Sequence, residues 1–298
     1  MGKGVKMSIC KDGNVLEELL RLLKLEKIEE NIFRGQSQDL GFGNVFGGQV
    51  IGQALSAASR TMSSDFQAHS LHGYFMLAGD ATKPIVYTVD CIRDGRSFGT
   101  RRVVAIQNGR AIFSMAASFH MREQGYEHQS DMPDIEGPEG IENDVEMARR
   151  LSDKISPDIL EKFSCKKPIE IRVVNPIDLF SPKPMPPEKY VWFRAIDKMP
   201  DDAAIHRYML AYTSDFHLVG TSLYPHGKTF WSPDMQVASL DHSIWFHRRF
   251  RMDDWLLYVM KSPNAGRGRG LSFGSIYTRQ GVLVASVAQE GLIRILKK

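Results

Sequence analysis

Polar and apolar residues follow two different periods in the first half of the chain. Residues 47–61 combine a broad apolar face with a narrow polar one at the helical period, which predicts a helix built largely of small residues. Three β-rich runs follow at 83–93, 97–107 and 111–119, separated by Asp94-Gly95 and Asn108-Gly109. These dipeptides favour type I′ hairpin turns, because both central residues need positive φ. We therefore expect a helix followed by an antiparallel meander.

The second half repeats this pattern, with a helix predicted at 203–219 and strands after it. The expected strands are 239–246, 255–262, 270–279 and 282–289. Aligning 70–75 with the segment from 239, and 112–118 with 283–289, gives an offset of about 170 residues each time, which indicates an internal duplication. Each copy is one helix plus a largely antiparallel sheet that curls around it, so the fold class is α+β. The two copies could pair their sheets side by side.

The stretch between the two copies has a different character. Residues 122–165 are acidic, are interrupted by proline and glycine and contain short helical patches, and a proline-containing tract follows before residue 191. We predict an N-terminal domain at 14–121, a charged, proline-containing connection with short helices at 122–187, and a C-terminal domain at 188–296.

One carboxylate interrupts the apolar pattern of the second helix. At 100° per residue, Asp215 lies close to Tyr208, Tyr212 and Val219, in the centre of the apolar stripe, and His217 falls on the other side. Burying an ionised carboxylate is unfavourable by several kcal/mol unless a partner or a pKa shift compensates. Asp215 is therefore either a paired structural acid or a functional group.

Composition and charge narrow the function classes. A net charge of +3 is too small to favour nucleic acid, although it is compatible with an anionic small ligand. Three widely separated cysteines without metal spacing indicate a reduced compartment and no structural zinc. No segment approaches the length of a membrane span. We expect a soluble intracellular protein without a metal, a nucleic-acid partner or a membrane span.

Seven segments carry a family resemblance: FRGQSQDLGFGNVFGGQVIGQAL, HSLHGYF, RDGRSFGTRRVVAIQNG, AAIHRYMLAYTSDF, SLDHSIWFHRRF, DDWLLY and GVLVASVAQEG. In matching order from about residue 14 to 294, they closely resemble the type II acyl-CoA thioesterases, which are bacterial enzymes with peroxisomal counterparts in animals. The resemblance implies two fused hotdog domains and hydrolysis of medium- to long-chain fatty acyl-CoA to free acid and CoA, without a cofactor. It also implies a catalytic trio of Asp215, Ser239 and Gln289.

The hydroxyl residue and the last residues of the chain differ between members of this family. The hydroxyl residue resembles the serine of the animal form, whereas the bacterial form has threonine. Animal peroxisomal members typically end in an SKL-like tripeptide, and this chain ends in RILKK. The resemblance implies the peroxisomal matrix, with the cytosol or another compartment as the alternative. We also expect a homo-oligomer.

The residues themselves are compatible with this chemistry. Strand alternation places Gln289 at the end of an apolar file, and Ser239 on one face with Met235 and Val237. A base that takes a proton from water, with donors that hold the water, would permit attack on a thioester carbonyl. We assign the base to Asp215 and the water-holding groups to Ser239 and Gln289. Direct attack by the carboxylate through an anhydride is the alternative.

Other residues are candidates for substrate binding. Gly47 and Gly48 precede the first helix and could offer backbone N–H groups to an oxyanion. Gln49 could reach the groove between the domains or act as a helix-packing residue. Arg267 and Arg269 could bind CoA phosphates or lie in a solvated loop. The histidines at 242 and 247 lack a third metal ligand, which favours structural roles.

Two rival functions are considered. A hotdog enoyl-CoA hydratase would need an aspartate and histidine pair, and the available partner, His217, is predicted on the opposite helix face from Asp215. A non-catalytic acyl-CoA-binding protein is the second rival. Assaying thioester cleavage and alkene hydration side by side distinguishes a thioesterase from the hydratase. Binding of acyl-CoA without turnover would identify the non-catalytic binding protein.

Overall fold

The computed structural model describes residues 14–41, 43–150, 152–153, 166–178 and 181–296. The first half contains α1 (Val15–Leu23), β1 (Glu26–Glu29), β2 (Ile32–Gly35), α2 (Gly47–Ser59), β3 (Phe66–Phe75), β4 (Ile85–Asp94), β5 (Phe98–Gln107) and β6 (Arg110–Met121). The remainder contains α3 (Asp144–Arg150), β7 (Ile169–Val173), β8 (Glu188–Ala195), α5 (Ala203–Thr213), α6 (Leu218–Thr221), the 3-10 helix η1 (Tyr224–His226), β9 (Met235–Ser239), β10 (Asp241–Phe246), β11 (Leu256–Gly266), β12 (Arg269–Thr278) and β13 (Leu283–Ile295). The predictions for Cys10, Cys165 and both chain ends concern residues outside the described ranges.

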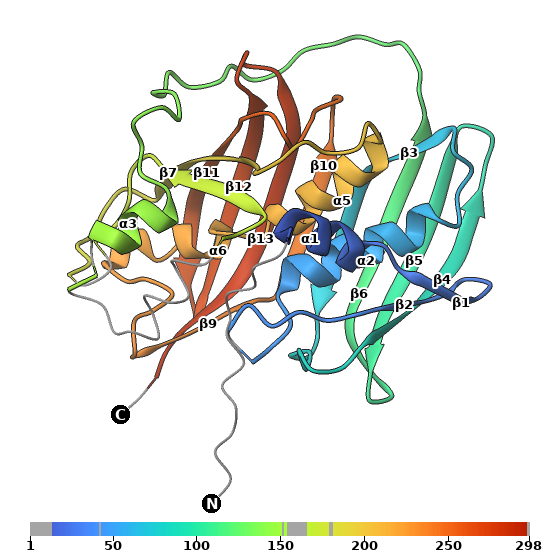
Figure 1. Cartoon of the computed structure of the whole chain (residues 1–298), viewed down its shortest axis with the longest axis horizontal. Coiled ribbons are helices and arrows are strands. Elements are labelled where there is room, and N and C mark those ends of the chain that lie inside the picture. Colours follow the sequence, from blue (N-terminus) through green and yellow to red (C-terminus); the bar gives the residue numbers. More distant parts are fainter. Residues whose placement is uncertain (1–13, 42, 151, 154–165, 179–180, 297–298) are drawn as a thin grey trace, which may run out of the picture.

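One antiparallel sheet runs through the described part of the molecule. Its strand order is β1-β2-β4-β5-β6-β3-β10-β13-β12-β11-β8-β7, and β9 pairs with β13 off this path. The two halves join where β3 pairs with β10, with His72 opposite Ser243. Helices α2 and α5 lie side by side against one face of this sheet (Figure 1). The expected α+β class, with each copy's sheet around a central helix, is confirmed.

Small residues allow the two central helices to approach closely. Gly48 lies so near α5 that a Cβ atom there would clash with the carbonyl oxygen of Tyr212. Ala54, Ala57 and Ala58 are fully buried in the same core. Gln49, Gln53 and Ser56 of the predicted polar face are also buried, whereas Arg60 is exposed. The Gln53 side chain donates to the carbonyls of residues 22 and 36 and accepts from the Tyr87 hydroxyl. The residues of α2 from Gly48 to Ala58 are therefore buried.

The predicted meander is present as β4, β5 and β6. Asn108 and Gly109 have φ values of 50° and 72°, as the two-residue turn requires. The other turn is longer than predicted, because Asp94 pairs with Gly99. In the second half the predicted strand at 239–246 is divided, since β9 ends at Ser239 and β10 begins at Asp241.

Two elements differ from those expected from the sequence. The stretch predicted as connection contributes β7, which pairs with β8 at the edge of the sheet, with Ile171 opposite Phe193. The helix predicted at 203–219 ends at Thr213, because the chain turns there and His217 adopts a left-handed conformation with a φ of 68°. Asp215 therefore lies in the turn between α5 and α6, and its burial does not come from the helical phase used to predict it.

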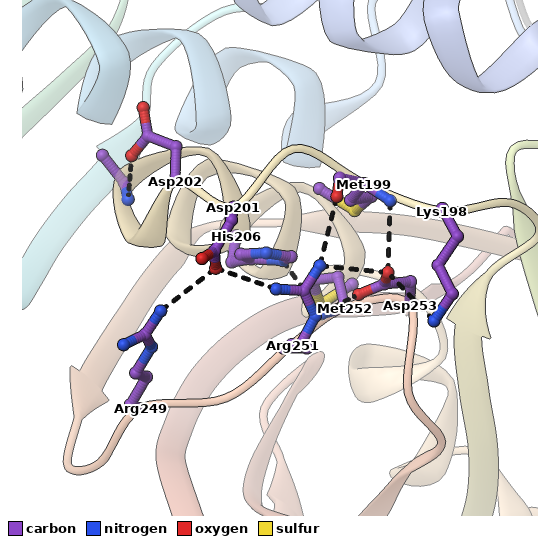
Figure 2. Close-up of polar contacts among 10 residues, drawn as sticks. Lys198, Met199, Asp201, Asp202, His206, Arg249, Arg251, Met252 and Asp253 are labelled. Atoms are coloured by element: carbon purple, nitrogen blue, oxygen red, sulfur yellow. Dashed lines mark hydrogen bonds and ion pairs between the residues drawn. The ribbon is translucent and has the colours of Figure 1, made fainter.

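A polar cluster fixes the start of α5 (Figure 2). Asp202 caps the helix by accepting from Ala204 N–H at 2.8 Å. Arg251, in the connection between β10 and β11, donates to Asp253, Asp201 and the Met199 carbonyl. His206 Nδ1 accepts from Met252 N–H at 3.0 Å. Although burial opposes it, hydrogen bonds from Arg251 and from Met199 N–H hold the pKa of Asp253 below its ordinary value.

No helix in the described ranges is long and apolar enough to cross a membrane. Within those ranges there is also no group of three histidine, cysteine or acidic side chains that could hold a metal ion. Cys91 has an exposed free thiol.

Candidate active site

Three separate elements bring Asp215, Ser239 and Gln289 together. Asp215 comes from the turn after α5, Ser239 from the end of β9 and Gln289 from β13. Gln289 Nε2 donates to Asp215 Oδ1 at 2.6 Å, and Ser239 Oγ donates to the same oxygen at 3.3 Å. The two residues therefore contact the carboxylate directly, and β9 and β13 pair antiparallel beside it with Ser239 opposite Gly291.

The carboxylate of Asp215 is almost fully enclosed. Its side chain is 4% exposed, and burial raises the pKa of Asp215 above its ordinary value. Hydrogen bonds from Gln289, from Gly48 N–H and from Ser239 oppose that increase. The result is a carboxylate that is a stronger base than a solvated one and is still held in one position by three donors.

The N-terminus of α2 meets this carboxylate. A Cβ atom on Gly47 would lie 2.7 Å from Asp215 Oδ2, so a side chain there would occupy the space beside that oxygen. The Gly48 N–H bonds to the carboxylate, where the positive end of the helix dipole favours an anion. The structure thus brings both predicted glycines to Asp215, with the donor of Gly48 directed at the carboxylate.

His242 is a neighbour of Asp215 for which sequence reasoning favoured a structural role. Its Nδ1 lies 3.9 Å from Asp215 Oδ1, and its Nε2 lies 2.9 Å from Ser214 Oγ. Because Ser214 Oγ donates to the Ala211 carbonyl, His242 Nε2 is the donor to Ser214, and Nδ1 presents a lone pair toward Asp215. Burial lowers the pKa of His242 to about 3, so the ring is neutral. Alternation along β10 would have placed His242 on the buried face with Ile244.

A cavity of about 2440 Å³ opens next to these residues. Asp215, Ser239 and Gly47 line it together with apolar side chains from both halves of the chain. The lining includes Phe46, Phe75, Phe113, Ile112, Val219, Phe230, Trp231 and Val237. An apolar cavity with a few convergent polar groups is typical of a small-molecule site.

The other predicted residues lie elsewhere. Gln49 is buried, accepts from Gln38 N–H at 3.0 Å and donates to the Gln36 carbonyl, so it fixes the segment before α2. Arg267 lies in the turn between β11 and β12 with a φ of 51°, and Arg269 pairs with Glu290 at 3.0 Å. The described residues that line the cavity include none of these three.

Both halves of the chain match known protein families. The family profile described as acyl-CoA thioesterase matches residues 159–292, and the one described as acyl-CoA thioesterase N-terminal domain matches residues 36–120. The chain is 44% identical over 281 residues to acyl-CoA thioesterase 2 of Haemophilus influenzae, covering 94% of this chain and 98% of that protein.

Solved structures are similar over nearly the whole length as well. Acyl-CoA thioesterase II TesB2 from Mycobacterium marinum matches with a TM-score of 0.76 at 43% identity, over 93% of this chain and 98% of that one. A protein with a hot dog fold from Alicyclobacillus acidocaldarius matches with a TM-score of 0.75 at 18% identity, over 94% of this chain and 99% of that one. This second likeness shows the fold alone, and it confirms the hotdog architecture.

Proposed function

The chain belongs to the acyl-CoA thioesterase family and is a thioester hydrolase by that membership, and we propose that it cleaves medium- to long-chain fatty acyl-CoA to free fatty acid and CoA. One observation carries the assignment of the reaction to a particular site. The carboxylate of Asp215 receives hydrogen bonds from Ser239 and Gln289 at the wall of a large, mostly apolar cavity.

In this proposal Asp215 is the general base. Oδ1 is occupied by the donors from Ser239 and Gln289, so Oδ2, which faces the space beside Gly47, is the oxygen that accepts a proton from water. The water oxygen bonds to the thioester carbonyl carbon, the carbon–sulfur bond breaks, and the proton held by Asp215 passes to the CoA sulfur.

The geometry changes one detail of the prediction from sequence. Ser239 and Gln289 were expected to hold the attacking water, and in the structure both donate to Asp215 itself. Their proposed role is therefore to orient the carboxylate, with Ser239, which lines the cavity, also able to contact the water. Direct attack of Asp215 on the thioester is the alternative route, and ¹⁸O from labelled water found in Asp215 after turnover would identify it.

A direct assay separates this function from its rivals. Release of CoA thiol is measured with saturated acyl-CoAs of increasing chain length, and loss of the enoyl absorbance is measured with 2-enoyl-CoAs. Thiol release without hydration supports the proposal, and hydration without thiol release, or tight binding of palmitoyl-CoA without turnover, contradicts it. The structure places His217, predicted on the opposite helix face, in the same turn as Asp215 and at the same cavity. The hydratase is disfavoured because His217 Nδ1 is already bonded to Lys189 Nζ, and His242, the histidine beside Asp215, is not among the described residues that line the cavity.

Two further expectations stay predictions. The homo-oligomer is tested by light scattering of the purified protein. The peroxisomal matrix, with the cytosol as its alternative, is tested by microscopy of the tagged chain.

A further inference from the structure

A buried lysine lines the same cavity as Asp215. Lys189 on β8 is 8% exposed and lines this cavity. Its Nζ donates to His217 Nδ1 at 3.0 Å and lies 5.3 Å from the centre of the Tyr224 ring. Lysine is almost never buried without a partner, so an ammonium held by a neutral ring and an aromatic face is unusual.

Lys189 has no direct anionic partner in the described part of the chain. Among the described residues no carboxylate lies within ion-pair distance of Nζ. Asp144 is the carboxylate that acts on it from a distance, and Asp144 is already paired with Lys167. Burial lowers the pKa of Lys189 to about 8, which leaves it mainly protonated at neutral pH. Burial also lowers the pKa of His217 well below its usual range, so its ring is neutral and accepts from the ammonium.

The position of His217 connects this pair to the reaction site. His217 follows Asp215 by two residues in the turn between α5 and α6. Its backbone has a φ of 68°, a conformation that is uncommon outside glycine and tends to occur at functional sites. Because the ammonium uses one of its three hydrogens for His217, it keeps donors for a ligand in the cavity.

The other cations of the cavity differ from Lys189. Arg150 pairs with Glu142 and Lys167 pairs with Asp144, and Lys166 is exposed to solvent. Lys189 is thus the buried cation of the described lining, and an anionic ligand group would compensate its desolvation.

We propose that Lys189, positioned by His217, binds an anionic group of the substrate inside this cavity. The chemistry is a charge-assisted hydrogen bond from the ammonium to a carboxylate on the acyl chain or to a phosphate of CoA. This inference rests on the proposed thioesterase function. It adds a binding site for a second charge on the acyl chain or for the phosphates of CoA.

The test compares substrates that differ in one anion. Values of kcat/KM are measured for hexanoyl-CoA, for adipoyl-CoA, which adds a terminal carboxylate to the same six-carbon chain, and for hexanoyl-pantetheine, which lacks the phosphates. Pairs with eight and ten carbons extend the series. If the wild-type protein cleaves none of these thioesters, the proposed function fails, and that outcome is separate from failure of the site at Lys189.

The informative variant is Lys189→Met, which keeps the length of the side chain and removes its charge. If the acyl carboxylate is bound, this variant lowers kcat/KM about tenfold or more for adipoyl-CoA and less than about twofold for hexanoyl-CoA. If a CoA phosphate is bound, it lowers both CoA values about equally and leaves hexanoyl-pantetheine unchanged. Either result supports an anion site. Unchanged values for all three substrates, or an equal loss that includes the pantetheine thioester, would overturn it.

Matched variants separate binding from folding. Lys261→Met makes the same substitution at an exposed lysine on the neighbouring strand β11, and we expect unchanged selectivity there. Lys189→Arg keeps the charge and should retain most of the substrate discrimination. His217→Asn introduces a residue that also tolerates the left-handed backbone conformation. It should weaken the discrimination between substrates without abolishing it. Thermal unfolding of each variant shows whether the fold is retained.

Discussion

At the scale of single residues, opposing influences on the pKa of Asp215 set the pH dependence expected of the proposed reaction. Burial raises its pKa, and donors from Gln289, Gly48 and Ser239 lower it. Catalysis by the carboxylate requires its ionised form, so the rate should fall as the pH drops through a pKa that lies above the ordinary value near 3.9.

This balance predicts the behaviour of Ser239→Ala. Removing one donor leaves burial less opposed, so the pKa of Asp215 should increase further and the acid limb of the kcat/KM profile should move to higher pH. The profile between pH 4 and 8 is measured with one acyl-CoA for both proteins. An acid limb that stays in place or moves to lower pH would show that Ser239 does not stabilise the ionised carboxylate.

Residue-level prediction from sequence reached part of this site. The burial of Asp215 was predicted correctly, although the helix that justified it ends at Thr213. The contacts of Ser239 and Gln289 depend on strands far apart in the chain, so the family resemblance was needed to select them. Neither the pair of Lys189 and His217 nor the approach of His242 to Asp215 was predicted. Both depend on a turn and on tertiary contacts that local periodicity does not encode.

At the scale of elements, the contact between α2 and α5 controls the position of the site. We expect Gly48→Ala to reduce the free energy of unfolding by about 1–3 kcal/mol, because the new methyl group would overlap the Tyr212 carbonyl and neither helix backbone can yield easily. Urea unfolding measures the change. Gly220→Ala is the control, since no atom of the described residues lies within 4 Å of its added Cβ. Equal stability of Gly48→Ala and the wild type would contradict the close packing described.

The cluster at the start of α5 makes a prediction about acid stability. The pKa of Asp253 is lower in the folded state than in the unfolded one. Its contribution to the free energy of unfolding is therefore complete above about pH 4 and is lost as the pH falls through the folded-state pKa. Asp253→Asn should be less stable than the wild type by about 1–3 kcal/mol at pH 7, and the difference should narrow at pH 3. Urea unfolding at both pH values measures it.

The control for this cluster is Asp201→Asn. Asp201 also pairs with Arg251, but its side chain is 72% exposed, so a smaller change is expected. The difference in free energy of unfolding between Asp253→Asn and the wild type should not stay constant from pH 7 to pH 3. A constant difference would show that the ion pair does not stabilise the fold through its charge.

At the scale of the whole molecule, the duplication seen in sequence becomes one continuous sheet. The antiparallel class followed from periodicity and turn signals, and the repeated spacing raised the possibility that the two copies pair their sheets side by side. The edge strand β7 was missed, because a five-residue strand inside an acidic, proline-containing stretch has too weak a pattern. The division into domains at 14–121 and 188–296 stays a proposal.

The shared sheet predicts that the halves depend on each other. A chain limited to residues 14–121 would expose the face of α2 that packs on α5 and the edge of β3 that pairs with β10. We expect this fragment to lack a cooperative thermal transition by circular dichroism, whereas the full chain shows one. A cooperative transition in the isolated fragment would show that the interface between the halves is not needed for folding.

The central claim is that the buried carboxylate of Asp215 takes the proton from water, and Asp215→Asn tests it most directly. The substitution keeps the shape and removes a buried charge whose raised pKa disfavours the folded state at neutral pH, so the unfolding temperature should be equal or higher. The kcat for acyl-CoA hydrolysis at pH 7 should fall by on the order of 10²-fold or more. Wild-type kcat in the folded variant would contradict the role of Asp215.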